Sequence, residues 1–203
     1  MSNSEILKRA KELVELLEKQ EKSCRVRLSE LNPGDIFQTT GKRKYKVLEQ
    51  CAEYTKIISL GFVKKNAKFD DDTTDYNKSS LKKLCDTEIL KDFEEEFGEE
   101  NIETDIVDLI TVDGRKIAET ECKVRPLTFD EVRKYTELTP NNELDDSYWT
   151  CSAWSTAERG WRYALAVVTP SGNIGGNVYS SSDGVRPVCI LKSNIFVSKV
   201  EEE

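Results

Sequence analysis

The sequence contains no histidine among its 203 residues. Histidine is the side chain whose charge changes near neutral pH. Its absence therefore removes the usual general base, the serine–histidine–aspartate triad and every zinc site that uses an imidazole. Enzymatic chemistry would have to use lysine, glutamate or cysteine, and no pattern of these residues signals it. We therefore expect a protein that is not an enzyme and needs no cofactor.

Closely spaced cysteines are also missing. Cys24 and Cys51, the closest of the six, stand 27 positions apart, and no CxxC pair occurs. This spacing predicts neither a zinc site nor a thioredoxin-like pair, so we expect no metal. Charges interrupt the apolar residues at the start of the chain, which predicts no signal peptide, and no apolar run is long enough to span a membrane. We expect free thiols in the cytoplasm of a host cell or in a virion, with disulfides as the alternative.

Positive charge is in short supply, because the net charge is −8. A protein that binds nucleic acid without regard to sequence needs cations to displace the counterions of phosphates, and binding to anionic lipid needs them too. The charge therefore predicts no direct nucleic-acid partner and no membrane partner, and it permits a basic protein partner. Charged residues make up 33% of the chain and hydrophobic residues 37%, which suits a small core under a well-solvated surface.

An amphipathic helix is predicted over residues 2–22. Ser2 and Glu5 form a capping box, and apolar residues follow at helical spacing from Ile6 to Leu17. This helix either packs on its own domain or forms a short coiled coil that makes a homo-oligomer. We predict an N-terminal helix over residues 1–24 and one folded domain over residues 25–203.

The rest of the chain predicts an α+β fold, because strands come first, helices follow and strands close the sequence. Residues 26–63 alternate with period two and predict a meander of three antiparallel strands. Three short helical segments are predicted in this part of the chain. Ser79 or Ser80 caps the first, at LKKL, and the second follows Asp86 and Thr87 and ends at Gly98. The third is opened by a capping box at residues 128–131. Residues 164–169 and 186–191 predict two buried strands.

Several groups of polar residues could suggest chemistry but favour a structural interpretation. The acidic stretch at residues 66–78 lacks the spacing of a calcium loop and predicts a solvated loop. Asp145 and Asp146 are adjacent and would point apart in a strand, so they make a poor acid–base pair. Cys151 has no histidine to activate it, which favours a buried thiol over a reactive one.

The last third of the chain is rich in aromatic, hydroxyl and amide side chains. All three tryptophans lie between Trp149 and Trp161, and small polar residues dominate positions 171–183. Rigid aromatic rings among serine, glycine and asparagine are typical of recognition surfaces, although we expect at least one tryptophan to be buried. The predicted binding residues are Tyr148, Trp154, Trp161, Tyr163, Asn173, Asn177, Tyr179, Ser181 and Asp183.

Three segments in this region resemble a known bacterial and phage domain family. They read YWTCSAW at 148–154, ALAVVTPSGNI at 164–174 and DGVRPVCIL at 183–191. Supporting similarity lies in DYNKSSLKKL, VDLITVDG and PLTFDEVRKY, so that the likeness spans about residues 31–197. Tyr148 stands where the family has a tryptophan, and Thr150 and Cys151 replace its usual bulky residue and arginine.

The resemblance implies a C-type-lectin-like fold, with a small twisted antiparallel sheet, short helices and a loop-built face near the C-terminus. This family has no assigned function and is related to formylglycine-generating proteins and to phage receptor-binding proteins diversified by retroelements. The resemblance does not imply sugar binding through calcium, because the motifs for it are missing. Within this fold Gly184 is expected to permit a close approach or a positive φ, and Arg186 is expected to be structural.

The sequence therefore leads to three functional hypotheses. The first is a non-catalytic binding module of phage or prophage origin that presents its C-terminal loop face to a protein or glycan. The second is an acidic intracellular inhibitor of a host protein. The third is a cysteine enzyme of the formylglycine-generating type.

Overall fold

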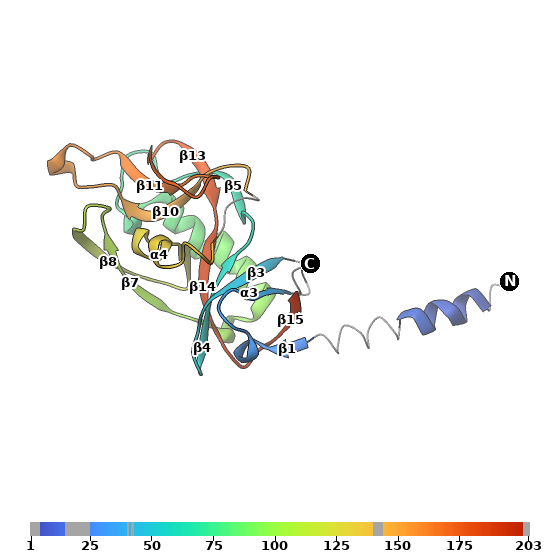
Figure 1. The fold of residues 1–203 in the computed structure, drawn as a ribbon. Coiled ribbons are helices and arrows are strands. Elements are labelled where there is room, and N and C mark those ends of the chain that lie inside the picture. The colour runs from blue at the N-terminus through green and yellow to red at the C-terminus, as the bar shows by residue number, and fades with distance from the viewer. Residues whose placement is uncertain (1–4, 15–24, 40, 42, 140–143, 201–203) are drawn as a thin grey trace.

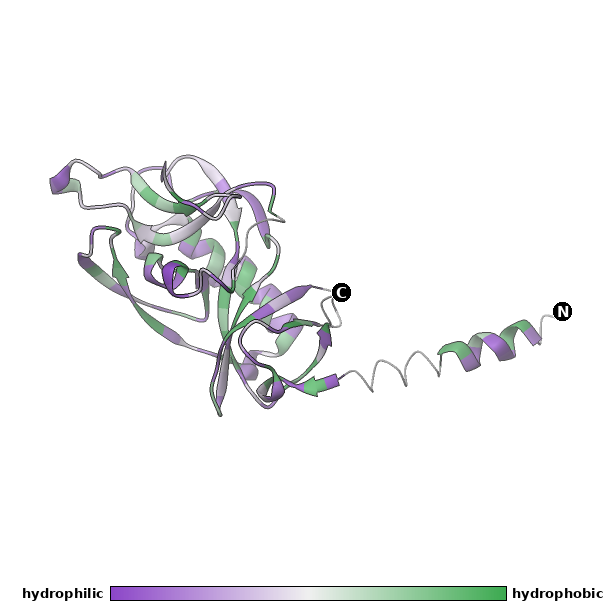
Figure 2. Cartoon of the chain, in the orientation of Figure 1, coloured by the Kyte–Doolittle hydropathy of each residue, from purple (hydrophilic) through white to green (hydrophobic). Residues whose placement is uncertain are grey.

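The computed structural model describes residues 5–14, 25–39, 41, 43–139 and 144–200. Residues 5–14 form a helix that is exposed along its whole length, with apolar and charged residues interspersed (Figure 2). The helix predicted over residues 2–22 is confirmed for this part, and its proposed cap at Ser2 lies outside the described residues. The homo-oligomer and the domain boundary between residues 24 and 25 stay predictions.

The larger of three sheets has eight strands and contains the predicted meander. Its strands follow the order β1-β15-β2-β3-β4-β14-β6, and β9 also pairs with β14. The consecutive antiparallel strands β2, β3 and β4 confirm the meander. The bounds are β1 Arg25–Arg27, β2 Ile36–Gln38, β3 Lys44–Gln50, β4 Tyr54–Ser59, β6 Ile102–Glu103, β9 Val124–Pro126, β14 Pro187–Lys192 and β15 Phe196–Val200, with a 3-10 turn η1 at Leu28–Glu30.

The predicted binding residues lie in a second sheet of five strands and in the segments that connect its strands. Its order is β12-β11-β10-β13-β5, so that β12 and β5 form its edges. The bounds are β5 Lys64–Lys68, β10 Tyr148–Ala153, β11 Ala164–Val168, β12 Ile174–Val178 and β13 Ser182–Val185, with a 3-10 turn η5 at Ala157–Arg159 between β10 and β11.

The two predicted buried strands are confirmed as β11 and β14, but they lie in different sheets. The polar segment between them, residues 171–183, is not one continuous loop. It contributes β12, which forms a hairpin with β11, and it enters β13. The small antiparallel sheet that the resemblance implies is extended in the structure, because the described chain forms three sheets and Tyr148 of β10 pairs in parallel with Gly184 of β13.

The chain between β5 and β6 forms a series of short helical segments. Ser79 accepts a hydrogen bond from the Lys82 backbone at 3.0 Å and so caps the first predicted segment, and the second ends at Gly98 with φ +86°, as predicted. The structure joins the two segments without a break, because residues 85–89 between them form a π-helical turn. The bounds are η2 Tyr76–Lys78, α2 Ser80–Leu84, a π-helical turn η3 Cys85–Ile89, α3 Leu90–Phe97 and η4 Glu99–Asn101. The structure is thus a mixed helix and strand fold in which strands predominate (Figure 1).

The acidic stretch at residues 66–78 is more ordered than the solvated loop that the sequence predicted. Its first residues belong to β5, and Asp70 is buried. Burial alone would raise the pKa of Asp70, but hydrogen bonds from the Asp72 and Ser80 backbones lower it below its usual value. Asp70 therefore holds the chain between β5 and α2, which is a structural role.

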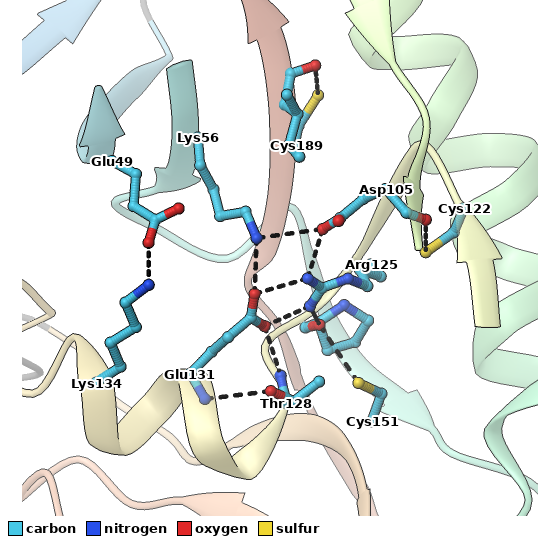
Figure 3. Close-up of polar contacts among 12 residues, drawn as sticks. Glu49, Lys56, Asp105, Cys122, Arg125, Thr128, Glu131, Lys134, Cys151 and Cys189 are labelled. Carbon is cyan, nitrogen blue, oxygen red and sulfur yellow. Dashed lines mark hydrogen bonds and ion pairs between the residues drawn. The ribbon is translucent and has the colours of Figure 1, made fainter. Parts of the chain in front are cut away.

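A buried cluster of charges joins strands of the larger sheet to a short helix (Figure 3). Arg125 of β9 is 1% exposed and bonds to Asp105 at 2.6 Å and to Glu131 at 2.7 Å. Lys56 of β4 lies 2.9 Å from Glu131, and Thr128 completes the predicted capping box. The helix is α4, Phe129–Lys134, and Asp105 begins a third sheet, the hairpin of β7 Asp105–Ile110 and β8 Lys116–Cys122.

Candidate functional site

Two tryptophan rings lie together at one end of the five-stranded sheet, and an exposed tyrosine follows them in the chain. Trp154 follows β10 and is half-buried, and its ring centroid lies 6.2 Å from that of Trp161. Trp161 and Tyr163 precede β11, and each is 45% exposed. We call Trp154, Trp161 and Tyr163 the aromatic face. Exposed aromatic rings held near a regular sheet supply contact area at low entropy cost.

The loop that carries the aromatic face is fastened to the tip of the β7–β8 hairpin. Asp113, in the turn of that hairpin, accepts hydrogen bonds from Thr111 at 2.6 Å and Ser155 at 2.7 Å, and it pairs with Arg159. These hydrogen bonds and the Arg159 charge lower the pKa of Asp113 to about 2. Figure 1 shows the η5 loop projecting beside this hairpin. Asp113 therefore stays charged at neutral pH and orders a loop that carries exposed rings.

Strand β12 of the five-stranded sheet packs against the Trp154 ring. A Cβ atom placed on Gly176 of β12 would lie 3.3 Å from the Trp154 ring, so glycine lets the indole settle on the strand. The backbone N–H of Trp154 donates to the Ala164 carbonyl at 2.9 Å, which fixes the residue at the start of β11. Val178, 39% exposed, pairs with Ala164 and extends the apolar surface along β12.

Two predicted binding residues are buried, and the prediction that they belong to an exposed face is corrected. Tyr148 is 0% exposed, because β10 is covered on both faces and the guanidinium of Arg186 lies 5.6 Å from the centre of its ring. Asp183 is 4% exposed and accepts a hydrogen bond from Asn177 at 2.8 Å. Burial raises the pKa of Asp183, as expected for a carboxyl group removed from water.

The remaining predicted residues lie along the β11–β12 hairpin and the turn after it. Asn173 is exposed in the hairpin turn, and its amide donates to Ser171 at 3.1 Å. Asn177 is half-buried through its bond to Asp183, and Tyr179 is half-buried against the main core. Ser181 is half-buried, and its backbone N–H donates to the Val178 carbonyl. The structure therefore brings Asn177 and Tyr179, as partly covered groups, to the end of β12 beside the start of β11, whereas Asn173 lies at the opposite end of the hairpin.

Gly184 and Arg186 occupy positions that a structural role requires. A Cβ atom on Gly184 would lie 2.4 Å from the Phe62 ring, so the glycine serves a close approach rather than a positive φ. Arg186 is 1% exposed and donates from Nε to the Ser59 carbonyl at 2.8 Å. It thus ties the start of β14 to the end of β4, and it lies against Tyr148 at the start of β10, the end of that strand opposite Trp154.

Trp149 is the buried tryptophan that the sequence led us to expect. It is 0% exposed, donates from Nε1 to the Ala67 carbonyl at 2.7 Å and packs edge-on against Phe69. Trp149 therefore belongs to the core that packs against the five-stranded sheet, and its side chain is not exposed to solvent.

The cysteines of the described chain are free, and most are buried. Cys51 is exposed, whereas Cys85, Cys122, Cys151 and Cys189 are buried. Burial raises the pKa of Cys151, which is 1% exposed and donates to backbone carbonyls of the segment before α4. Burial likewise raises the pKa of Cys122 to about 11. These thiols are poorly suited to act as nucleophiles near neutral pH.

Neither a metal cluster nor a membrane helix is found in the part of the chain that the structure describes. Within residues 5–14, 25–39, 41, 43–139 and 144–200, no group of three or more cysteine and carboxylate side chains is placed to hold a metal ion. The helices in the same ranges are all too short or too polar to cross a bilayer.

Comparison of the chain with known protein families, with characterised proteins and with solved structures finds no match. The geometry of the aromatic face and the charge of the chain therefore carry the functional argument.

Sequence reasoning missed two residues that shape this site. Asp113 stands more than forty positions from the Ser155 and Arg159 groups that it binds, so no local pattern could reveal the contact. Val178 resembles an ordinary strand residue in the sequence, and its exposure follows from the edge position of β12.

A hollow of about 230 Å³ also opens beside the loop between β10 and β11, and it is lined in part by Ile117, Thr156 and Ala157.

Proposed function

We propose that the chain is a non-catalytic binding module with a C-type-lectin-like fold, of phage or prophage origin, that recognises a protein or glycan through its aromatic face. The observation that carries the proposal is the exposure of Trp161 and Tyr163, each 45% exposed, on a loop that Asp113 fastens to the hairpin. Large aromatic side chains in such positions are frequent anchors of binding energy.

The charge of the chain supports a second candidate of the same kind. At −8 the chain would attract a basic partner over long range, which favours an acidic intracellular inhibitor of a host protein. Both candidates are binders and both would use the aromatic face. A cysteine enzyme of the formylglycine-generating type is less favoured, because Cys151 and Cys189 are 1% and 2% exposed and carry thiols whose pKa is raised by burial.

The test is a selection for ligands with the full chain, using a library of random displayed peptides and an array of glycans. The double variant Trp161→Ala with Tyr163→Ala removes both exposed rings. We expect it to lose binding about thirtyfold or more, the loss that corresponds to roughly 2 kcal/mol at a hot spot. The free energy of unfolding should change by no more than about 0.5 kcal/mol, as at ordinary surface sites.

A matched control removes two aromatic rings that are equally exposed on the other large sheet. Tyr54 is 40% exposed and Phe196 is 53% exposed, and both lie outside the aromatic face. The double variant Tyr54→Ala with Phe196→Ala should bind the selected ligand as the wild type does. Equal losses in both double variants, or no ligand from either collection, would contradict the proposal.

A further inference from the structure

The edge strand β12 has a row of backbone groups that face away from its sheet. It pairs with β11 on one side, and none of the strands that the structure describes pairs with it on the other. The Tyr179 N–H donates to the Tyr163 carbonyl at one end of this pair, and the Thr169 N–H donates to the Asn173 carbonyl at the other. Bonding alternates along antiparallel strands, so these two contacts fix which residues of β12 face β11.

The alternation turns the N–H and C=O groups of Ile174, Gly176 and Val178 outward. At Val178 both groups are satisfied locally, since its N–H donates to the Asn177 side chain and its C=O accepts from Ser181. No group in the described chain bonds to the outward N–H or C=O of Ile174 and Gly176. These four backbone groups are therefore free to pair with an added strand.

The edge also lacks the charges that normally prevent such pairing. Natural proteins place charged residues, especially lysine, on exposed edge strands to discourage the addition of other chains. No charged residue occurs between Pro170 and Asp183, although 33% of the whole chain is charged. The other edge strands of the described sheets all carry charged residues, namely β1, β5, β6, β7, β8 and β9.

The aromatic face lies beside this open edge. Trp154 covers Gly176, and the Trp161 ring stands next to that of Trp154. Side chains of an added strand would alternate in direction, so every second one would point to the indole side of the sheet. The free backbone groups and the adjoining rings together have the character of a site for an extended peptide.

We propose that the ligand of this module is an extended, uncharged peptide segment of a partner protein that pairs with β12 and places alternate apolar side chains against Trp154 and Trp161. This inference rests on the proposed function, because it assigns the ligand class of the same face. The backbone of Ile174 and Gly176 supplies hydrogen bonds, and the rings supply selectivity for apolar side chains.

A second copy of the chain fits the edge less well than a partner peptide does. Each copy carries a net charge of −8, so two copies repel each other. Ile174, Gly176 and Val178 share the indole side of β12, and Gly176 at the centre has no side chain to cover the ring surface of a facing copy. A partner segment with larger side chains would cover it.

The experiment begins with random 12-residue peptides displayed on phage and selected against the full chain. The selected peptide is then synthesised with an N-methyl group on each amide in turn, which removes one hydrogen-bond donor at a time without altering the protein. We expect methylation to weaken binding at least tenfold at the two positions, two residues apart, whose N–H groups donate to the Ile174 and Gly176 carbonyls, and less than twofold at the position between them. Exchange of the Ile174 and Gly176 amide hydrogens should slow at least tenfold when the unmethylated peptide is bound.

Two variants test the edge from the side of the protein. Gly176→Pro removes the outward N–H, and Gly176→Ala adds a Cβ atom near Trp154 but keeps the N–H. We expect the proline variant to bind at least tenfold more weakly than the alanine variant, with both folded by circular dichroism. Equal binding by the two variants overturns the inference.

The remaining outcomes separate this inference from the proposed function. Peptides that lose affinity in the Trp161→Ala variant, yet show neither alternation nor amide protection, overturn strand pairing and retain the aromatic face as the site. A failure to select any peptide, with glycans bound instead, has the same meaning. A dimer in sedimentation equilibrium that Gly176→Pro abolishes assigns the edge to a second copy and overturns the inference.

Discussion

Substitution of Glu131 by glutamine removes one negative charge from the buried cluster in Figure 3. Glutamine has nearly the same size, and its amide oxygen can still accept the hydrogen bond from the Thr128 backbone that caps α4. The substitution therefore preserves the cap, while Arg125, 1% exposed, and Lys56 lose one of the two carboxylates that face them and keep Asp105. Its effect on stability measures the contribution of the charge.

The magnitude follows from the pKa of Glu131. Burial alone would raise that pKa, but the hydrogen bonds and charge of Arg125, with the charge of Lys56, lower it from 4.5 to about 2. A shift of this size corresponds to about 3 kcal/mol of folding stability at pH 7. Because the folded pKa lies below the unfolded one, this stabilisation is present above about pH 4.5 and is lost as the pH falls toward 2.

Urea denaturation of the wild type and of Glu131→Gln, at pH 7 and at pH 3, tests this reasoning. We expect the variant to be less stable by about 3 kcal/mol at pH 7 and by roughly half that amount at pH 3. Asp130→Asn is the control, because Asp130 is exposed and lies 3.6 Å from Arg133 in a surface pair. A difference at pH 7 below about 0.5 kcal/mol, or one that does not change with pH, would refute the account.

Three further predictions concern the frame of the site. Gly184→Ala should destabilise the protein by about 1–3 kcal/mol in thermal unfolding, because the added Cβ atom would lie 2.4 Å from a ring carbon, whereas Gly61→Ala, with nothing within 4 Å, should not. Asp113→Ala should speed limited trypsin cleavage after Arg159, because it frees the loop that carries the aromatic face; an unchanged cleavage rate would show that Asp113 does not order the loop. A thiol-reactive label at pH 8 should modify the exposed Cys51 rapidly and the four buried thiols, Cys85, Cys122, Cys151 and Cys189, only after denaturation. Rapid labelling of any of these four in the folded protein would contradict their burial.

Local features of the fold could be predicted because their causes lie within a few residues. Ser79 and Thr128 are helix caps whose partners are three residues away, and Gly98 ends its helix through its own φ of +86°. The runs that became β11 and β14 are apolar because those strands are buried. Such local patterns can be recognised in the sequence without knowing how the rest of the chain folds.

The pairing of strands and the burial of particular polar residues could not be predicted in this way. β10 is buried on both faces, so no alternation in its sequence separates Tyr148 from Trp149. Asp183 resembles a surface residue until β13 brings it to Asn177 and buries it. The contact of Asp113 with the loop that carries the aromatic face depends on how the β7–β8 hairpin packs beside that loop. No local sequence pattern predicts this packing, because the contacting residues are more than forty positions apart.

The most direct test of the aromatic face follows the three indole N–H signals in a nitrogen–proton spectrum of the chain during titration with a selected ligand. Trp149 Nε1 is bonded to Ala67 in the core, Trp154 is half-buried, and Trp161 is 45% exposed. We predict that the signals of Trp154 and Trp161 shift in proportion to the ligand bound, while that of Trp149 stays in place. Saturation of the chain with ligand while the Trp154 and Trp161 signals stay unmoved would contradict the assignment of this face as the binding site.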